Sequence, residues 1–98
     1  MSVFNSAIDL GSETFAENHA FVEGLNGTLR ERLAVVAGGG REALIDRHHK
    51  RGKLLARERI DRLIDPGTAF LEFSTLAAWG QYDNEVPGAG IVTGIGTI

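Results

Sequence analysis

An apolar residue recurs at every seventh position in the early part of the chain, and this repeat restricts the fold more than any other feature. Its members are Phe15, Val22, Leu29 and Val36, and Leu25 and Leu33 extend the same stripe. This spacing is typical of a long amphipathic helix. We expect the helix to begin at Thr14, with Thr14 and Glu17 forming a capping box. The stripe has to be covered, either by the rest of its own domain or by another subunit.

Glycine and proline divide the following residues into short elements. The triplet Gly38–Gly40 is expected to end the long helix as a flexible cap and hinge, although a glycine run before a helix can also present amides to a phosphate. A short helix over 41–50 is expected to turn Ala43 and Leu44 inward. Gly52 separates it from a further helix over 55–64.

The helix over 55–64 is expected to bury a side formed by Ile60, Leu63 and Ile64. Its charged residues, Arg57 among them, are expected to face solvent or to pair along the helix, as Glu58 and Arg62 can. The turn residues Asp65, Pro66 and Gly67 end this helix.

Beyond Gly67 the pattern changes from helical to alternating. It predicts a strand over 69–76 with Leu71 and Phe73 on one face, a loop over 77–87, and a strand over 91–98. The last strand has no turn after it and no evident partner for its edge, so we expect the beginning of a larger fold. The chain thus divides into a mobile arm over 1–13, a helical part over 14–66, and the start of a sheet domain over 67–98.

Length and composition limit the class of protein. The 98 residues suffice for one small domain or part of a larger one. The chain has no cysteine, which excludes disulfides and cysteine-ligated zinc. Its longest apolar runs are too short for a membrane span or a signal peptide, so we expect a soluble intracellular protein that does not associate with membranes.

The charge is concentrated in one basic block within an acidic chain. Residues 41–65 hold eight of the ten basic and five of the 13 acidic residues, while the whole chain has a net charge of −3. The run from Arg47 to Lys53 has three interpretations: a solvated helix end whose cations lie near the last carbonyls, a phosphate-binding patch, and a nucleic-acid site. The acidity of the remaining residues disfavours nucleic acid.

The sequence contains no recognisable catalytic motif. His48 and His49 are neighbours on a helix, about 100° apart around its axis, so they do not share a metal ion unaided, and we expect no metal site. The glycines from Gly88 to Gly94 are spaced wrongly for a dinucleotide fingerprint and open a strand rather than a helix. Glycines at alternate strand positions more often allow close packing or a close approach of a ligand.

Two longer runs carry a resemblance to a known family. Residues 51–72, RGKLLARERIDRLIDPGTAFLE, closely resemble the opening motif of the carboxyltransferase β subunits of biotin-dependent acyl-CoA carboxylases. Residues 82–96, YDNEVPGAGIVTGIG, resemble the methylcrotonyl-CoA branch of that family more than the propionyl-CoA branch. The resemblance implies an α/β fold: N-terminal helices followed by the first strands of a crotonase-like carboxyltransferase domain, incomplete in this chain.

The resemblance also implies an activity. Members of the family transfer a carboxyl group from carboxybiotin, supplied by a partner subunit, to an acyl-CoA, here 3-methylcrotonyl-CoA, with geranyl-CoA or propionyl-CoA as alternatives. Backbone amides form oxyanion holes in these enzymes. Those segments lie outside the matched residues, so we expect no catalytic residue here and no activity from these residues alone. One departure from the family is Leu55, where many relatives have a capping Thr.

Further expectations concern ligands and partners. Lys53 and Arg57 are the candidates for contacts to the acyl-CoA, because both carry positive charge within the matched motif. The alternative role for them is a structural salt bridge. The expected partners are an α subunit with biotin carboxylase and biotin carrier functions, and further β subunits in a hexameric core. The expected location is the bacterial cytoplasm or, in a eukaryote, the mitochondrial matrix. The alternative hypothesis is a non-catalytic helical module, or a truncated carboxylase fragment, that docks on a partner subunit.

Overall fold

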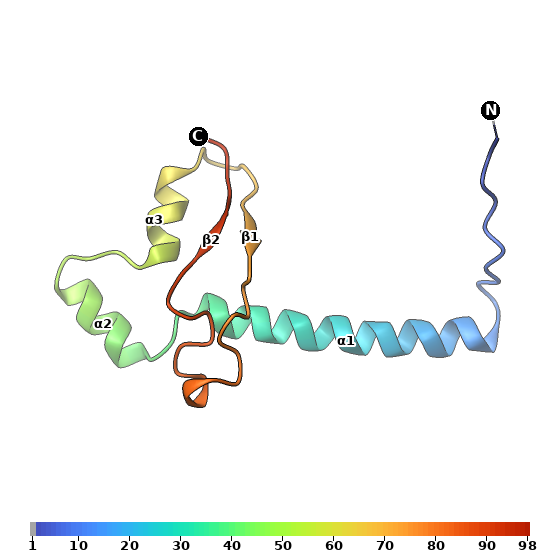
Figure 1. Cartoon of the computed structure of the whole chain (residues 1–98), viewed down its shortest axis with the longest axis horizontal. Helices are drawn as coiled ribbons and strands as arrows, with labels where there is room; N and C mark the ends of the chain where they lie inside the picture. Colours follow the sequence, from blue (N-terminus) through green and yellow to red (C-terminus); the bar gives the residue numbers. More distant parts are fainter. Residues whose placement is uncertain (1) are drawn as a thin grey trace. The chain divides into compact units, whose positions relative to one another are not determined.

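The long helix predicted near the start of the chain is present as α1 (Glu13–Ala37) in the computed structural model, which describes residues 2–98 (Figure 1). Ser12 caps its first turn, because the Ser12 Oγ accepts the N–H of Phe15 over 3.1 Å. The prediction of a cap at Thr14 was wrong. Both residues are of capping type, but Ser12 is the one that lies directly outside the first helical residue, where a side chain reaches the free N–H groups.

The predicted glycine cap at the end of α1 is confirmed. Gly39 and Gly40 adopt the left-handed region, with φ angles of 83° and 111°. The Gly39 N–H donates to the Val36 carbonyl over 3.0 Å and so satisfies one of the last carbonyls of the helix. A side chain at Gly40 would also place its Cβ 2.8 Å from the Glu85 carbonyl oxygen, so the close approach of residue 85 requires glycine here.

The chain divides into two compact units, the residues up to Arg30 and Glu31–Ile98, and α1 contributes residues to both. In the first unit, Val22 and Leu29 of the apolar repeat expose 49% and 47% of their surface. In the second unit, Val36 is buried, with 4% exposed. The apolar repeat is therefore largely exposed among the described residues. Any surface that buries it has to come from outside these residues.

Two short helices follow in the second unit. They are α2 (Glu42–Lys50) and α3 (Ala56–Leu63), and Gly52 turns the chain between them with a φ angle of 73°. The predicted inward side of α2 was wrong, because Leu44 is 54% exposed while Ile45 and His48 are half-buried. In α3, Ile60 is half-buried as predicted, but Leu63 is 61% exposed.

The two predicted strands pair with each other. β1 (Leu71–Phe73) and β2 (Thr93–Ile95) form an antiparallel ladder in which Leu71 lies opposite Ile95. The expectation that the last strand lacks a partner was therefore wrong, and both strands are shorter than predicted. A loop that contains the short 3-10 helix η1 (Tyr82–Asn84) connects them.

One face of the strand pair is packed closely because β2 contains glycine. A Cβ on Gly94 would lie 2.5 Å from the Phe70 ring, and one on Gly96 would lie 2.7 Å from Ile64. On the other face, Leu71 and Ile95 are each 61% exposed. The succession of helices and a small sheet confirms an α/β arrangement for the second unit.

None of the helices in the described part of the chain combines the length and hydrophobicity that a membrane span requires.

Candidate functional site

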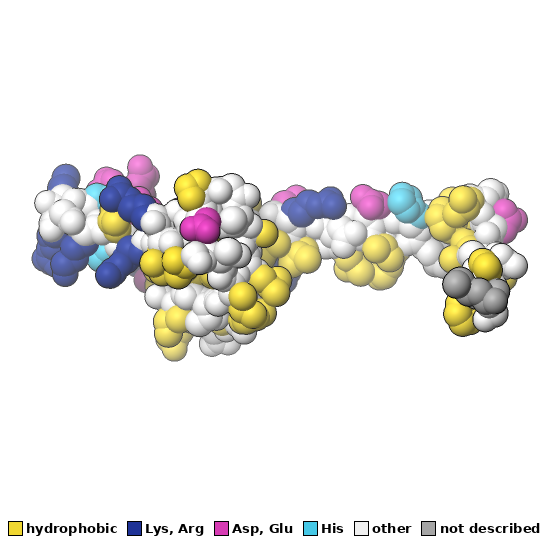
Figure 2. Space-filling view, turned by 90° about the horizontal axis from the view of Figure 1, so that it is seen from above, with side chains coloured by type: hydrophobic (Ala, Val, Ile, Leu, Met, Phe, Trp, Pro, Cys, Tyr) yellow, Lys and Arg dark blue, Asp and Glu magenta, His cyan; other side chains and the backbone are white. Residues whose placement is uncertain are grey.

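Four basic side chains lie together in sequence at the end of α2 and just after it. They are Arg47, Lys50, Arg51 and Lys53, and all are exposed. Figure 2 shows Lys and Arg side chains gathered over the part of the second unit that holds α2 and α3. The three ion pairs within residues 2–98 involve Arg41, His49 and Arg57, so these four cations are unpaired there. Such side chains are available to an anionic ligand.

Arg57, the second predicted ligand-binding residue, lies in a different environment. Its NH1 and NH2 groups donate to the two carboxylate oxygens of Glu72 over 2.8 and 2.6 Å. The two side chains are 29% and 18% exposed, and the Glu72 carboxylate raises the pKa of Arg57. Arg57 neither faces solvent nor pairs along its own helix, so that expectation was wrong, but the alternative role in a structural salt bridge is confirmed: the ion pair joins α3 to β1 across 15 residues of sequence. Lys53 and Arg57 are therefore not equivalent.

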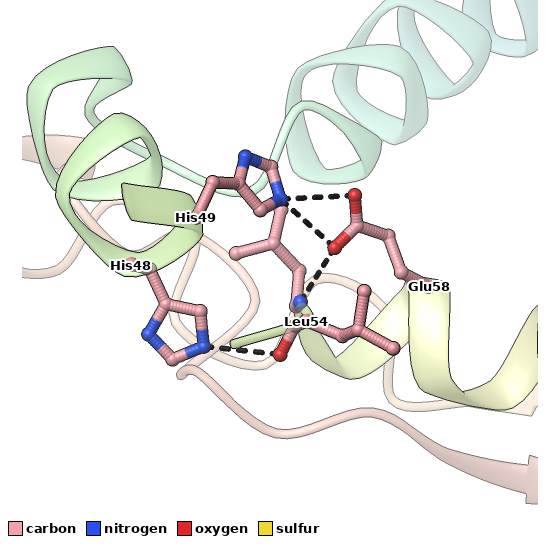
Figure 3. Close-up of polar contacts among 5 residues, drawn as sticks. His48, His49, Leu54 and Glu58 are labelled. Carbon is pink, nitrogen blue, oxygen red and sulfur yellow. Dashed lines mark hydrogen bonds and ion pairs between the residues drawn. The ribbon is translucent and has the colours of Figure 1, made fainter. Parts of the chain in front are cut away.

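The segment between α2 and α3, residues 51–55, is held by two neighbouring histidines (Figure 3). We call it the connector. The His48 Nε2 lies 3.0 Å from the Leu54 carbonyl oxygen, and the His49 Nε2 lies 2.9 and 3.0 Å from the carboxylate oxygens of Glu58. Glu58 also accepts the Leu55 N–H over 2.6 Å. These contacts begin in the last turn of α2 and end in the first turn of α3.

The Glu58 carboxylate acts as the cap of α3. Leu55, the residue before the helix, has no side-chain acceptor, and the carboxylate of Glu58 instead reaches back to the Leu55 N–H. The hydrogen bond from His49 and this contact lower the pKa of Glu58. The lack of a side-chain acceptor at Leu55 is thus partly offset by the second half of the capping box. The predicted partner of Glu58, Arg62, acts on it only through longer-range charge.

A cavity of about 280 Å³ lies beside the connector. Its apolar lining includes Val36 from the end of α1, Leu55 before α3, and Ile91 and Val92 before β2. Two polar side chains, His48 and Arg57, also line it, and each already makes the contact described above. The cavity suits a small apolar group and brings together no nucleophile and base among the described residues.

Within residues 2–98, no three histidine, cysteine or carboxylate side chains are grouped as a metal site would require. Sequence reasoning singled out Lys53 and Arg57 but missed the histidine contacts and Glu72. The adjacent His48 and His49 before Gly52 were the only local signal for the histidine contacts. These contacts themselves depend on the turn of the chain at Gly52.

Comparisons with known proteins agree with the family resemblance of the sequence. Residues 47–98 match the family model described as the carboxyl transferase domain. The chain is 44% identical over 98 residues, its whole length, to the mitochondrial methylcrotonoyl-CoA carboxylase beta chain of Arabidopsis thaliana. It is 53% identical over 85 residues, 87% of its length, to the biotin-dependent 3-methylcrotonyl-coenzyme A carboxylase beta1 subunit of Mycobacterium tuberculosis.

A relative from another branch matches a shorter stretch. The propionyl-CoA carboxylase beta chain of Cereibacter sphaeroides is 43% identical over 75 residues, which cover 71% of this chain. The chain spans about a sixth of the length of these curated relatives, 17%, 16% and 14% respectively.

Proposed function

The chain belongs to the carboxyl transferase domain family, and from that premise we propose that it serves in the carboxyltransferase subunit of a biotin-dependent acyl-CoA carboxylase. In the proposed reaction, carboxybiotin would supply its carboxyl group to a carbon of the acyl-CoA, and the proton that this carbon gives up would pass to the biotin nitrogen that the carboxyl group leaves. The observation that supports this proposal is the family match over residues 47–98, which includes the connector, α3 and both strands.

We propose 3-methylcrotonyl-CoA as the acyl acceptor. Two relatives named for this substrate align with 100% and 87% of the chain, whereas the relative named for propionyl-CoA aligns with 71%. The likeness to the methylcrotonyl branch thus extends over more of the chain. The proposed fold of the whole domain is crotonase-like, and the succession of helices and an antiparallel strand pair is consistent with it.

We assign the acyl-CoA contacts of this segment to Lys53 and Arg57. Lys53 is exposed and unpaired among the described residues, which suits a contact to a phosphate of CoA. Arg57 lines the apolar cavity, and its guanidinium has five N–H groups, of which those on two nitrogens face Glu72. Arg57 therefore lies beside the acyl-CoA in this proposal and also holds α3 against β1.

The residues of this segment do not form a site for carboxybiotin. The two polar side chains in the cavity, His48 and Arg57, are already engaged by Leu54 and Glu72. We therefore route no step of the transfer through them. When bound elsewhere in the complex, carboxybiotin supplies the carboxyl group. The proposed partners are a biotin-bearing α subunit and further β subunits.

Transfer of labelled carboxyl groups tests the proposal. The intact protein is combined with its biotin-bearing partner, labelled bicarbonate and 3-methylcrotonyl-CoA, and acid-stable label in the acyl-CoA product is counted. We expect label in the product and its loss when streptavidin sequesters the biotin. Carboxylated biotin without any labelled acyl-CoA product would contradict the proposal and would favour the non-catalytic docking module.

A further inference from the structure

The connector is tied to α2 through its backbone as well as through the two histidines. The Gly52 N–H donates to the His49 carbonyl over 2.8 Å, and the Lys53 N–H donates to the His48 carbonyl over 3.2 Å. Lys53 therefore starts from the C-terminal carbonyls of α2. The His48 ring next holds Leu54, and Glu58 holds Leu55. The backbone is thus held on both sides of Lys53, at the end of α2 and at Leu54. The direction of the Lys53 side chain therefore depends on both contacts.

The His48 contact does not depend on the charge of the ring. A carbonyl oxygen only accepts, so the His48 Nε2 carries the proton in this contact, whether the imidazole is neutral or cationic. His48 is also half-buried and lines the cavity. Arg57 is the other charged or titratable side chain in that lining. This hydrogen bond therefore forms with either charge state of the His48 ring.

The His49 contact changes in strength with the charge of the ring. The Glu58 carboxylate also only accepts, so the His49 Nε2 again carries a proton, but a cationic imidazole adds charge attraction to the hydrogen bond. The other charge that acts on this pair is Arg62 on α3, which acts on the same carboxylate. The two side chains are 41% and 39% exposed, so the effect is that of a surface ion pair.

We propose that His48 and His49 are positioning residues: together they fix the connector and so present Lys53 to its anionic ligand. The part that concerns the ligand rests on the proposed function. The part that concerns the connector rests on the contacts alone. The site that they position is the basic segment just after α2, and the ligand chemistry is a phosphate group such as those of CoA.

Hydrogen exchange in the intact protein tests the connector without reference to activity. The readout is protection of the peptide that covers residues 51–58, measured at one fixed pH. We expect protection at Leu55 to fall about two- to fivefold in His49→Ala, as for loss of an exposed ion pair. His49→Gln keeps an N–H donor and should retain more of the protection.

The matched control is His19→Ala on α1, which lies in the other compact unit. It should retain the wild-type protection of the connector. Equal protection of the connector in the wild-type protein and in His49→Ala would overturn the proposal.

Kinetics in the complete complex test the link to Lys53. We expect His49→Ala to raise KM for the acyl-CoA about two- to fivefold and to leave kcat within about twofold. In a Lys53→Met background the same substitution should have no further effect on KM. If Lys53→Met leaves KM unchanged while His49→Ala still lowers protection of the connector, the phosphate assignment is wrong and the histidine contacts stand. If His49→Ala leaves the protection unchanged, the role of the histidine contacts is wrong whatever the kinetics.

Discussion

Arg57 and Glu72 form a two-pronged ion pair that joins the first turn of α3 to the middle of β1, with N···O distances of 2.8 and 2.6 Å. Both side chains are largely shielded from solvent. A parallel pair of charged hydrogen bonds restricts both partners in orientation as well as in distance. The ion pair therefore fixes how α3, and the connector before it, lie against the sheet.

We predict that Arg57→Lys destabilises the intact protein by about 1 kcal/mol, because an ammonium group replaces two parallel hydrogen bonds with one point contact. Glu72→Gln should cost about 1–3 kcal/mol, because it leaves the guanidinium partly buried without its counter-charge. Denaturant unfolding of both single variants and the double variant measures the coupling. Strictly additive effects would contradict a direct interaction between these two residues.

The packing of Phe70 on β2 leads to a second prediction. A Cβ on Gly94 would meet the Leu71 carbonyl oxygen first and would also lie 2.5 Å from the Phe70 ring, and both contacts are closer than a Cβ can approach without movement. We expect Gly94→Ala to lower the free energy of unfolding by about 1–3 kcal/mol. Thermal unfolding of the intact protein measures it, and Phe70→Leu should relieve part of the cost. A Gly94→Ala variant as stable as the wild type would show that Phe70 does not cover this strand.

The two glycines inside α1 provide the opposite case. A Cβ on Gly24 or Gly27 meets nothing within 4 Å. Because glycine weakens a helix, Gly27→Ala should stabilise α1 by about 0.5–1 kcal/mol. The change is measured by thermal unfolding of the intact protein. Destabilisation would mean that another surface approaches the helix at this glycine, as the docking alternative requires.

Acid should weaken the start of α3. The pKa of Glu58 is lowered from its ordinary value of 4.5 by the hydrogen bonds from His49 and Leu55. A carboxylate with a lowered pKa in the folded state stabilises that state above its unfolded pKa, and the contribution is lost as the pH falls through the folded value. The stability difference between wild type and Glu58→Ala should therefore shrink as the pH falls below 4.5. A difference that grows in acid would contradict the assignment.

Much of the helical part was predictable because its signals are local. The seven-residue repeat, the glycine triplet and Gly52 mark the ends of α1 and α2 within a few residues. The cap at Ser12 was missed because Ser12 and Thr14 are similar in chemistry and only the path of the backbone before the helix distinguishes them. The pairing of β1 with β2 was missed because it joins residues 20 to 24 positions apart, and nothing in either strand's own pattern specifies its partner.

The candidate site divides in the same way. The exposure of Lys53 agrees with its place in a run of charge, which is a local property. The burial of Arg57 depends on Glu72, which lies 15 residues further along the chain, and the sequence pattern of α3 alone favours a solvent-facing arginine. The histidine contacts depend on the reversal of the chain at Gly52, which brings residue 49 to residue 58.

The most direct test of the central claim is the ratio of kcat/KM for 3-methylcrotonyl-CoA to that for propionyl-CoA, measured with the intact protein in complex with its biotin-bearing partner. We predict a ratio above about tenfold, which corresponds to about 1.4 kcal/mol of preferential transition-state binding. Equal values, or a preference for propionyl-CoA, would contradict the assignment to the methylcrotonyl branch. No transfer to either acyl-CoA would contradict the carboxyltransferase function itself.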